Sequence, residues 1–226
     1  MRTFVLIHGG GDVGWYWHLV EAELRARGHD TIAPDLPGDA SATLDDYADA
    51  VVATVGDRTD VVVVGQSFGA FTAPLVADRL GADALVLVAG MIPAPGEPPS
   101  DWWAATGYEQ AVREQAARDG GMTGNDDPYV AFMHDVPRAL AEEAMSRSRE
   151  DHPSDAAMAA PWPLDRWPDV PTRVVLCSED RFFPLDFMRR VAAERLGVVP
   201  DEIAASHCVA LSRPKELADL LEGDAA

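Results

Sequence analysis

The chain alternates between short apolar runs and longer segments in which apolar residues recur at helical spacing. Uninterrupted apolar runs bounded by glycine or polar residues are typical of strands buried on both faces of a parallel sheet. Six such runs predict strands, and they lie in "TFVLI", "DTIAPDLPG", "DVVVVG", "ALVLVAG", "TRVVLC" and "DEIAAS".

The segments between these runs predict helices that pack on the sheet. In "WYWHLVEAELRARGHD" the apolar positions include Leu19, Val20 and Leu24, and Gly28 marks the end of the helix. In "TLDDYADAVVATV" we expect Thr43 to be the N-cap, followed by acidic residues that match the helix dipole. Further helices are predicted in "FGAFTAPLVADRLG", "LDFMRRVAAERLG" and "PKELADLLE".

Alternating strands and helices predict an α/β fold with a mostly parallel, six-stranded sheet flanked by helices. The alternation stops after the fourth predicted strand. Residues 91–169 are rich in proline, tryptophan, glycine and aspartate, with helical patches and no strong strand signal. We therefore expect a core formed by residues 1–90 and 170–226, with residues 91–169 inserted as a helical cap.

The 226 residues suit one domain and carry a formal charge of −20, from 18 Lys and Arg against 38 Asp and Glu. Such a charge disfavours nucleic acids and anionic membranes as partners. The sequence contains no apolar run long enough to span a bilayer and no signal-peptide pattern at its start. Two cysteines, Cys177 and Cys208, are expected to be reduced and buried in a cytoplasmic protein, either a monomer or a homodimer.

The most specific motif is "GQSFG", in which Ser67 lies between Gly65 and Gly69. It follows a predicted buried strand and precedes a predicted helix, so a very tight turn must join them. Glycines leave room for the strand and helix to approach, and the serine hydroxyl projects at the carboxyl end of the sheet. The motif predicts a nucleophile beside a helix N-terminus.

A serine hydroxyl needs a base, and a histidine base needs a carboxylate to orient it. The candidate bases are His8, His18, His29, His134, His152 and His207. We favour His207, in the loop before the last helix. His8 suits a structural role in the first turn, and His18 and His29 are expected in solvent. His134 and His152 lie in the insert, where His134 could touch a substrate but more simply lies on the surface.

The carboxylate candidates are Glu179 and Asp180, which follow the fifth predicted strand. With Asp180 the chain order is serine, acid, histidine, the order used by nucleophile-elbow enzymes. Glu179 is the alternative.

The chain resembles the α/β-hydrolase superfamily over nearly its whole length, and within it the small plant methylesterase and hydroxynitrile lyase group with its bacterial esterase relatives. The resemblance rests on "LIHGGGDVGWYW", "GQSFGA", "SEDRFFP" and "SHCVALSRP". It implies a catalytic triad of Ser67, Asp180 and His207, with Asp180 and Pro184 matching a D-x-x-x-P segment. It also implies an oxyanion hole formed by the backbone N–H groups of Gly10 and Phe68.

Several aromatic residues in the insert and after the predicted acid indicate an apolar pocket. The candidates for its lining are Trp102, Trp103, Phe132 and Phe182. We therefore predict a serine hydrolase that cleaves small hydrophobic carboxylic esters through an acyl-enzyme, with no cofactor and no metal.

Two other functions remain open: a lyase that cleaves a cyanohydrin or another C–C bond with the same triad, and a ligand receptor with slow turnover. In the plant lyases that the chain resembles, a lysine follows the catalytic histidine and a threonine follows the first-strand histidine. Here these positions are Cys208 and Gly9, and both departures favour ester hydrolysis.

Overall fold

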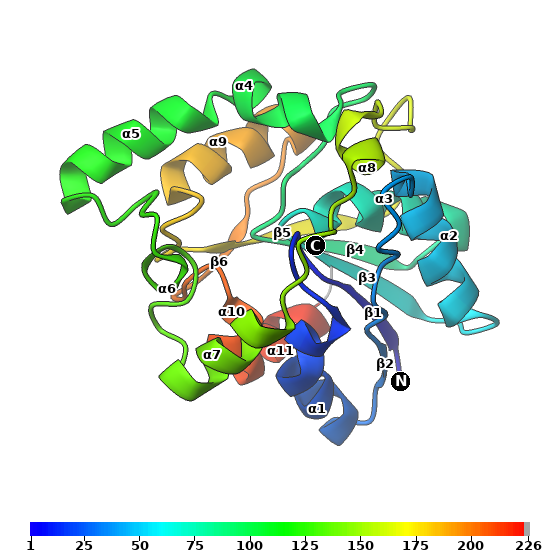
Figure 1. The fold of residues 1–226 in the computed structure, drawn as a ribbon. Helices are drawn as coiled ribbons and strands as arrows, with labels where there is room; N and C mark the ends of the chain where they lie inside the picture. The colour runs from blue at the N-terminus through cyan, green and yellow to red at the C-terminus, as the bar shows by residue number, and fades with distance from the viewer. Residues whose placement is uncertain (224–226) are drawn as a thin grey trace.

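The computed structural model describes residues 1–223, which form a six-stranded, fully parallel sheet with helices on both faces (Figure 1). The spatial strand order is β2-β1-β3-β4-β5-β6. The strands are β1 (Thr3–Ile7), β2 (Asp30–Ile32), β3 (Val61–Gln66), β4 (Ala84–Val88), β5 (Thr172–Cys177) and β6 (Asp201–Ile203). The predicted fold class is confirmed, and each of the six apolar runs contains a strand.

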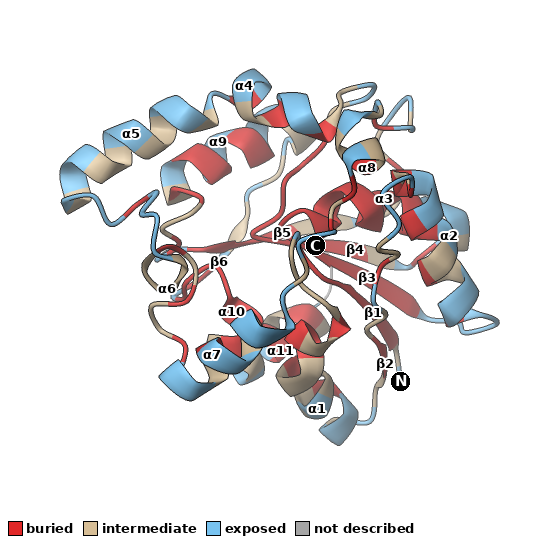
Figure 2. Ribbon diagram, in the orientation of Figure 1, coloured by how far each residue is buried: buried red, intermediate tan, exposed pale blue. Residues whose placement is uncertain are grey.

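Alternate residues of the four central strands, β1, β3, β4 and β5, enter two separate hydrophobic clusters, because successive side chains point to opposite faces of a sheet. In β1, Val5 and Ile7 pack in one cluster, whereas Phe4 and Leu6 pack in the other. Consequently the central strands are buried on both sides, as Figure 2 shows. This double burial explains why β3 is a run of valines without polar alternation.

The helices divide between the two faces in the same way. Residues of α2 (Leu44–Val55), α3 (Gly69–Leu80) and α9 (Leu185–Leu196) cover the first cluster. Residues of α1 (His18–Ala26), α10 (Val209–Ser212) and α11 (Pro214–Glu222) cover the second. A short 3-10 helix, η1 (Gly14–Trp17), precedes α1. The Thr43 cap is confirmed: its side chain accepts from the Asp46 N–H, and Asp46 reciprocates in a capping box.

The segment between β4 and β5 contains helices and no strand. Its helices are η2 (Pro99–Asp101), α4 (Trp102–Thr106), α5 (Tyr108–Asp119), α6 (Pro128–Ala131), α7 (Arg138–Arg147) and α8 (Asp155–Ala159). The start of this segment packs on α9, where the rings of Trp102 and Tyr108 each lie 5.8 Å from that of Phe187 (Figure 1). Farther along, Ala141 of α7 is buried in the cluster that also contains α10.

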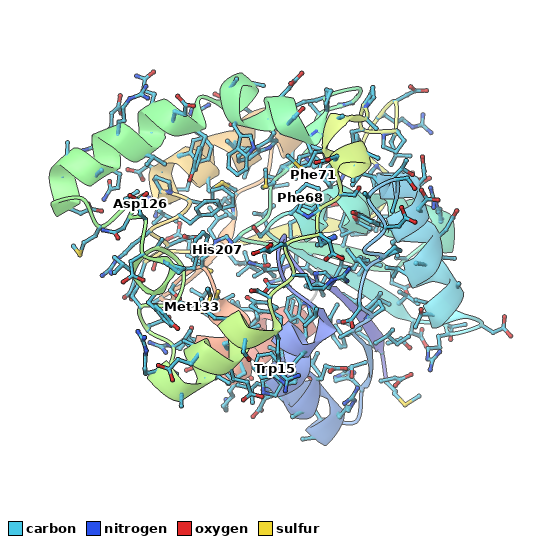
Figure 3. All side chains as sticks on the ribbon, in the orientation of Figure 1. Trp15, Phe68, Phe71, Asp126, Met133 and His207 are labelled. Carbon is cyan, nitrogen blue, oxygen red and sulfur yellow. The ribbon has the colours of Figure 1, made fainter. Side chains whose placement is uncertain are left out.

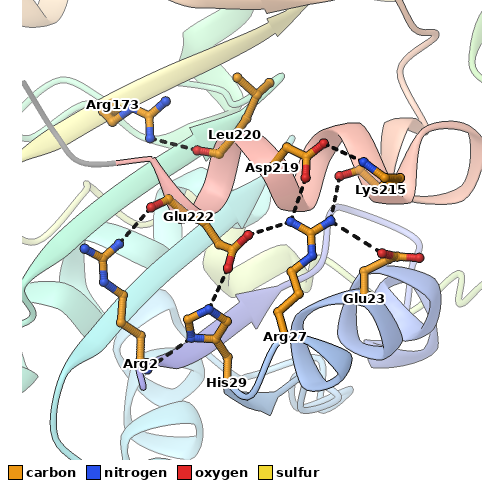
Figure 4. A network of polar contacts seen from close by, with 9 residues as sticks. All are labelled: Arg2, Glu23, Arg27, His29, Arg173, Lys215, Asp219, Leu220 and Glu222. Atoms are coloured by element: carbon orange, nitrogen blue, oxygen red, sulfur yellow. Dashed lines mark hydrogen bonds and ion pairs between the residues drawn. The ribbon is translucent and has the colours of Figure 1, made fainter.

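A network of polar contacts joins α1 to α11 (Figure 4). The imidazole of His29 bonds Glu222 at 2.8 Å and accepts from the backbone N–H of Arg2 at 3.1 Å. Arg27 also pairs with Glu222 at 2.5 Å. The hydrogen bond from this guanidinium, and to a smaller extent the one from His29, lowers the pKa of the Glu222 carboxyl. The expectation that His29 is free in solvent was therefore wrong, because α11 packs against the end of α1. Among residues 1–223 no helix is long and apolar enough to cross a membrane.

Candidate active site

Ser67 occupies a strained turn between β3 and α3. Its φ is +50°, in the left-handed region that L-residues avoid. The turn is tight enough that a Cβ on Gly65 would lie 2.6 Å from the Cβ of Ala73, and one on Gly69 would lie 2.5 Å from the His8 carbonyl oxygen. Backbone hydrogen bonds hold Ser67 in place. Its N–H donates to the Val88 carbonyl at 3.1 Å, and its carbonyl accepts from the Ala70 and Met91 N–H groups at 3.2 and 3.0 Å.

His207 and Asp180 form a buried pair on the loops that follow β6 and β5. The Nδ1 of His207 lies 2.7 Å from Oδ2 of Asp180. The other carboxylate oxygen accepts from the N–H groups of Phe182 and Phe183 at 2.8 and 3.0 Å. These donors orient the carboxylate toward the imidazole. Glu179, the alternative acid, is exposed, so the geometry favours Asp180.

The insert holds the His207 loop on both sides. The Ser206 N–H donates to the Asp135 carboxylate at 3.1 Å, and the Cys208 N–H donates to the Phe132 carbonyl, also at 3.1 Å. The Phe132 and Phe182 rings lie 5.5 and 5.2 Å from the imidazole and pack edge-on against it. His207 therefore cannot move away from Asp180 without displacing the insert.

The glycine-rich loop after β1 faces the same site. Within the described chain, neither the Gly10 nor the Phe68 N–H donates a backbone hydrogen bond to the protein. The neighbouring Gly11 is held in place by two backbone hydrogen bonds. Its N–H donates to the His152 carbonyl at 2.8 Å, and its carbonyl accepts from the Arg149 backbone N–H at 2.7 Å. The insert thus positions a loop in which one expected oxyanion donor, Gly10, remains available for a ligand.

Two further histidines, both buried, lie beneath this loop. His8 accepts from the Leu36 N–H at 3.1 Å and bonds the Gly9 carbonyl at 2.9 Å, in agreement with its expected structural role. His152 stacks edge-on against His8 with ring centroids 4.9 Å apart. Burial lowers their pKa values to about 4 for His8 and about 3 for His152, so both are neutral near pH 7. The buried position of His152 was not predicted, because its contacts come from distant parts of the chain.

A cavity of about 430 Å³ opens at the carboxyl ends of the strands, where Ser67 and His207 both line it. Figure 3 shows His207 near the centre of the molecule, with Phe68 and Met133 on opposite sides of it. The apolar side chains that line the cavity are those of Phe68, Met91, Trp103, Pro128, Phe132, Met133, Met145, Pro153, Met158 and Phe182. Such a lining suits a small hydrophobic ligand.

The structure places three of the four predicted pocket aromatics, Trp103, Phe132 and Phe182, in the cavity wall. Trp102 lies outside it. The Trp102 side chain is fully buried, and its indole N–H donates to the Ile92 carbonyl at 2.9 Å. The difference arises because adjacent residues of α4 point in different directions, and only Trp103 faces the cavity.

Sequence reasoning missed the polar residue Asp12 and the four methionines in the cavity wall. Methionine is common in any core and carries no positional signal. Asp12 follows the glycine-rich motif but has no recognised role in it. Burial raises the pKa of Asp12 to about 7. Among the described residues, no three His, Cys, Asp or Glu side chains group in a way that could hold a metal ion.

The neighbouring tryptophans of α4 provide a matched test of the cavity wall. Trp103→Ala should change the preference among esters of different chain length by about 1–3 kcal/mol in kcat/KM, because it enlarges the pocket. Trp102→Ala should leave the preference unchanged and instead lower the free energy of unfolding by about 3–5 kcal/mol. The measurements are kcat/KM over an ester series and denaturant unfolding. Equal shifts in preference for both variants would contradict the assignment of the wall.

A serine held in a nucleophile elbow at the end of a parallel sheet is characteristic of the α/β hydrolases. A family model described as alpha/beta hydrolases matches residues 4–220, and the chain belongs to that family. The resemblance inferred from the motifs is thereby confirmed.

Similar proteins include plant esterases. Methylesterase 7 from Arabidopsis thaliana is 27% identical, over 97% of this chain and 95% of the relative. Polyneuridine aldehyde esterase from Rauvolfia serpentina is 24% identical, over 97% and 94%. A crystal structure of polyneuridine aldehyde esterase superposes with a TM-score of 0.76 at 22% identity and covers 98% of both chains. The structural match supports the fold, and the sequence matches support hydrolase chemistry.

Proposed function

We propose that this protein is a serine carboxylesterase that uses Ser67 as nucleophile, His207 as base and Asp180 as the acid that orients the base. One observation carries the proposal: His207, whose Nδ1 lies 2.7 Å from the Asp180 carboxylate, lines the same cavity as the strained Ser67. Membership of the α/β hydrolase family and similarity to proteins named as esterases support a carboxylesterase-type hydrolase.

The proposed reaction follows from the positions of these groups. His207 takes the proton of the Ser67 hydroxyl through Nε2, while its Nδ1–H donates to Asp180. The serine oxygen attacks the ester carbonyl, and the N–H groups of Gly10 and Phe68 stabilise the oxyanion. The protonated His207 gives its proton to the departing alcohol. Water, activated by the same histidine, then hydrolyses the acyl-enzyme and releases the acid.

The cavity supports small hydrophobic esters as substrates. Its volume of about 430 Å³ is modest, and most of its apolar side chains are aromatic or methionine. We therefore propose short acyl or aryl esters. We also propose that residues 91–169 act as a cap, since this segment supplies much of the wall. The free, buried Cys177 and Cys208 support the proposed cytoplasmic location.

Hydrolysis of p-nitrophenyl esters of graded chain length tests the proposal, with mandelonitrile cleavage as the comparison. We expect hydrolysis of short esters and no lyase activity above background. At Gly9, the Cβ that a threonine would carry would clash with the side-chain amide oxygen of Gln66, so the residue of the plant lyases would fit only if the Gln66 side chain moved. Efficient mandelonitrile cleavage would overturn the esterase assignment. Tight ligand binding without turnover would instead indicate a receptor.

A further inference from the structure

Asp12 is an acidic side chain in the wall of an otherwise apolar cavity. It directly follows the glycine-rich loop, where its backbone N–H closes a turn onto the Gly9 carbonyl at 3.4 Å. The loop is anchored by the contacts of Gly11 with Arg149 and His152. Asp12 therefore lies on a rigid segment at the cavity that also contains Ser67.

The Asp12 carboxylate has no partner among the described residues: no hydrogen bond or ion pair joins it to another side chain or to the backbone. The titratable groups nearest to it are His207, Tyr16 and Cys208, and none of them is a permanent cation. Among residues 1–223, no lysine or arginine lines the cavity. Asp12 is partly buried and lacks a counter-charge, which is an unfavourable arrangement for an ion.

Arg147 is the one arginine that shares a smaller neighbouring crevice with Asp12. It is already engaged, because it pairs with Glu143 at 2.8 Å and its guanidinium lies 4.6 Å from the centre of the Trp15 ring. The protein thus provides no cation for Asp12, although it contains many ion pairs elsewhere. A ligand that brings its own positive charge would supply the missing partner.

The surrounding side chains also suit an organic cation. Phe68, Phe132, Trp103 and Phe182 line the cavity, and aromatic rings attract alkylammonium groups through their π faces. The methionines are polarisable and adapt to irregular ligands. We propose that Asp12 binds a protonated amine of the substrate, so that the preferred substrates are hydrophobic esters that carry a tertiary ammonium group. This inference rests on the proposed esterase function, and it adds a substrate class to it.

The first experiment compares two esters of nearly equal shape, 2-(dimethylamino)ethyl acetate, which is protonated at neutral pH, and its neutral isostere 3-methylbutyl acetate. The wild type should prefer the charged ester by about 10-fold to 100-fold in kcat/KM, the size expected of one partly desolvated charge pair. Asp12→Asn retains the size and polarity of the side chain and removes its charge. In this variant the preference should fall to within about threefold of unity, with the neutral ester still hydrolysed.

The net charge of −20 could attract cations without any specific site, so the matched control is Asp126→Asn. Asp126 is exposed in the loop before α6 and is not among the described residues that line the cavity. This variant changes the net charge as much as Asp12→Asn and should keep the full preference for the charged ester. An equal loss of preference in both variants, or no preference in the wild type, would overturn the proposal.

A binding measurement separates this inference from the proposed function. Protonated N,N-dimethylbenzylamine, which contains no ester, should bind the wild type in calorimetry at least about tenfold more tightly than it binds Asp12→Asn. Binding without ester hydrolysis would refute the esterase and leave the amine site standing. Hydrolysis of p-nitrophenyl esters, together with equal amine binding by both proteins, would refute the amine site alone.

The pH dependence of this binding provides a further test. Since burial raises the pKa of Asp12 to about 7, the carboxylate forms as the pH rises through that value, and amine binding should strengthen from about pH 6 to about pH 8. Three other titratable groups face Asp12. His207 repels cations when it is protonated. Tyr16 and Cys208 stay neutral, because burial raises their pKa values. Asp12→Asn retains all three groups, so a pH dependence that persists unchanged in this variant would assign it to His207 and contradict the proposal.

Discussion

Replacement of Ser67 by alanine is expected to abolish ester hydrolysis while the fold is retained. Without the hydroxyl no acyl-enzyme forms, and loss of a serine nucleophile typically lowers kcat by about 10⁶-fold. Within residues 1–223, the Ser67 side chain makes no hydrogen bond that supports the turn, which is held by backbone contacts to Val88 and Met91. Unfolding of Ser67→Ala should therefore match that of the wild type. The measurement is kcat for a p-nitrophenyl ester, beside a thermal unfolding curve.

A second serine in the same cavity provides the matched control. Ser148 lines the wall, and its hydroxyl donates to the Met145 carbonyl at 2.8 Å. Ser148→Ala should keep most of the activity. A serine-directed organophosphonate should label the wild type and Ser148→Ala stoichiometrically and leave Ser67→Ala unlabelled. Labelling of Ser67→Ala, or activity above a few per cent, would remove Ser67 from the role of nucleophile.

Asp180→Asn should lower kcat by about 10⁴-fold, because the imidazole proton of His207 would then lie on Nε2 instead of Nδ1. One oxygen of Asp180 accepts from the N–H groups of Phe182 and Phe183, and the asparagine carbonyl oxygen would keep these bonds. The amide NH₂ then faces Nδ1 of His207 at the 2.7 Å contact, and it can only donate. His207 must then carry its proton on Nε2, which can no longer accept the proton of Ser67.

The adjacent acid is the control for this substitution. Glu179 is exposed, and its backbone carbonyl, rather than its carboxylate, contacts His134 at 2.9 Å. Glu179→Gln should change kcat less than about threefold, the effect of a surface charge on a neutral substrate. Both variants and the wild type should be assayed over the same pH range. If Glu179→Gln were the inactive variant, the choice of acid would be wrong.

Local patterns were sufficient to predict the strands and the serine turn. The β3 valines and the glycines at 65 and 69 are neighbours in sequence, so the strand, the turn and the helix that starts there are all encoded within a few residues. The Thr43 cap is equally local. The four-residue helix α10, after His207, was not predicted, because so short a helix shows no periodicity.

The amino-acid sequence by itself determined the α/β class, the family and the candidate residues Ser67, Asp180 and His207, because apolar periodicity and short motifs are properties of adjacent positions. Only the tertiary structure decided which side chains meet at the cavity. Trp103 faces the cavity and Trp102 does not, and Asp12 lies in the same cavity wall as side chains of an insert that begins only at residue 91. Contacts of this kind depend on how the insert folds back over the sheet, and no local pattern records that packing.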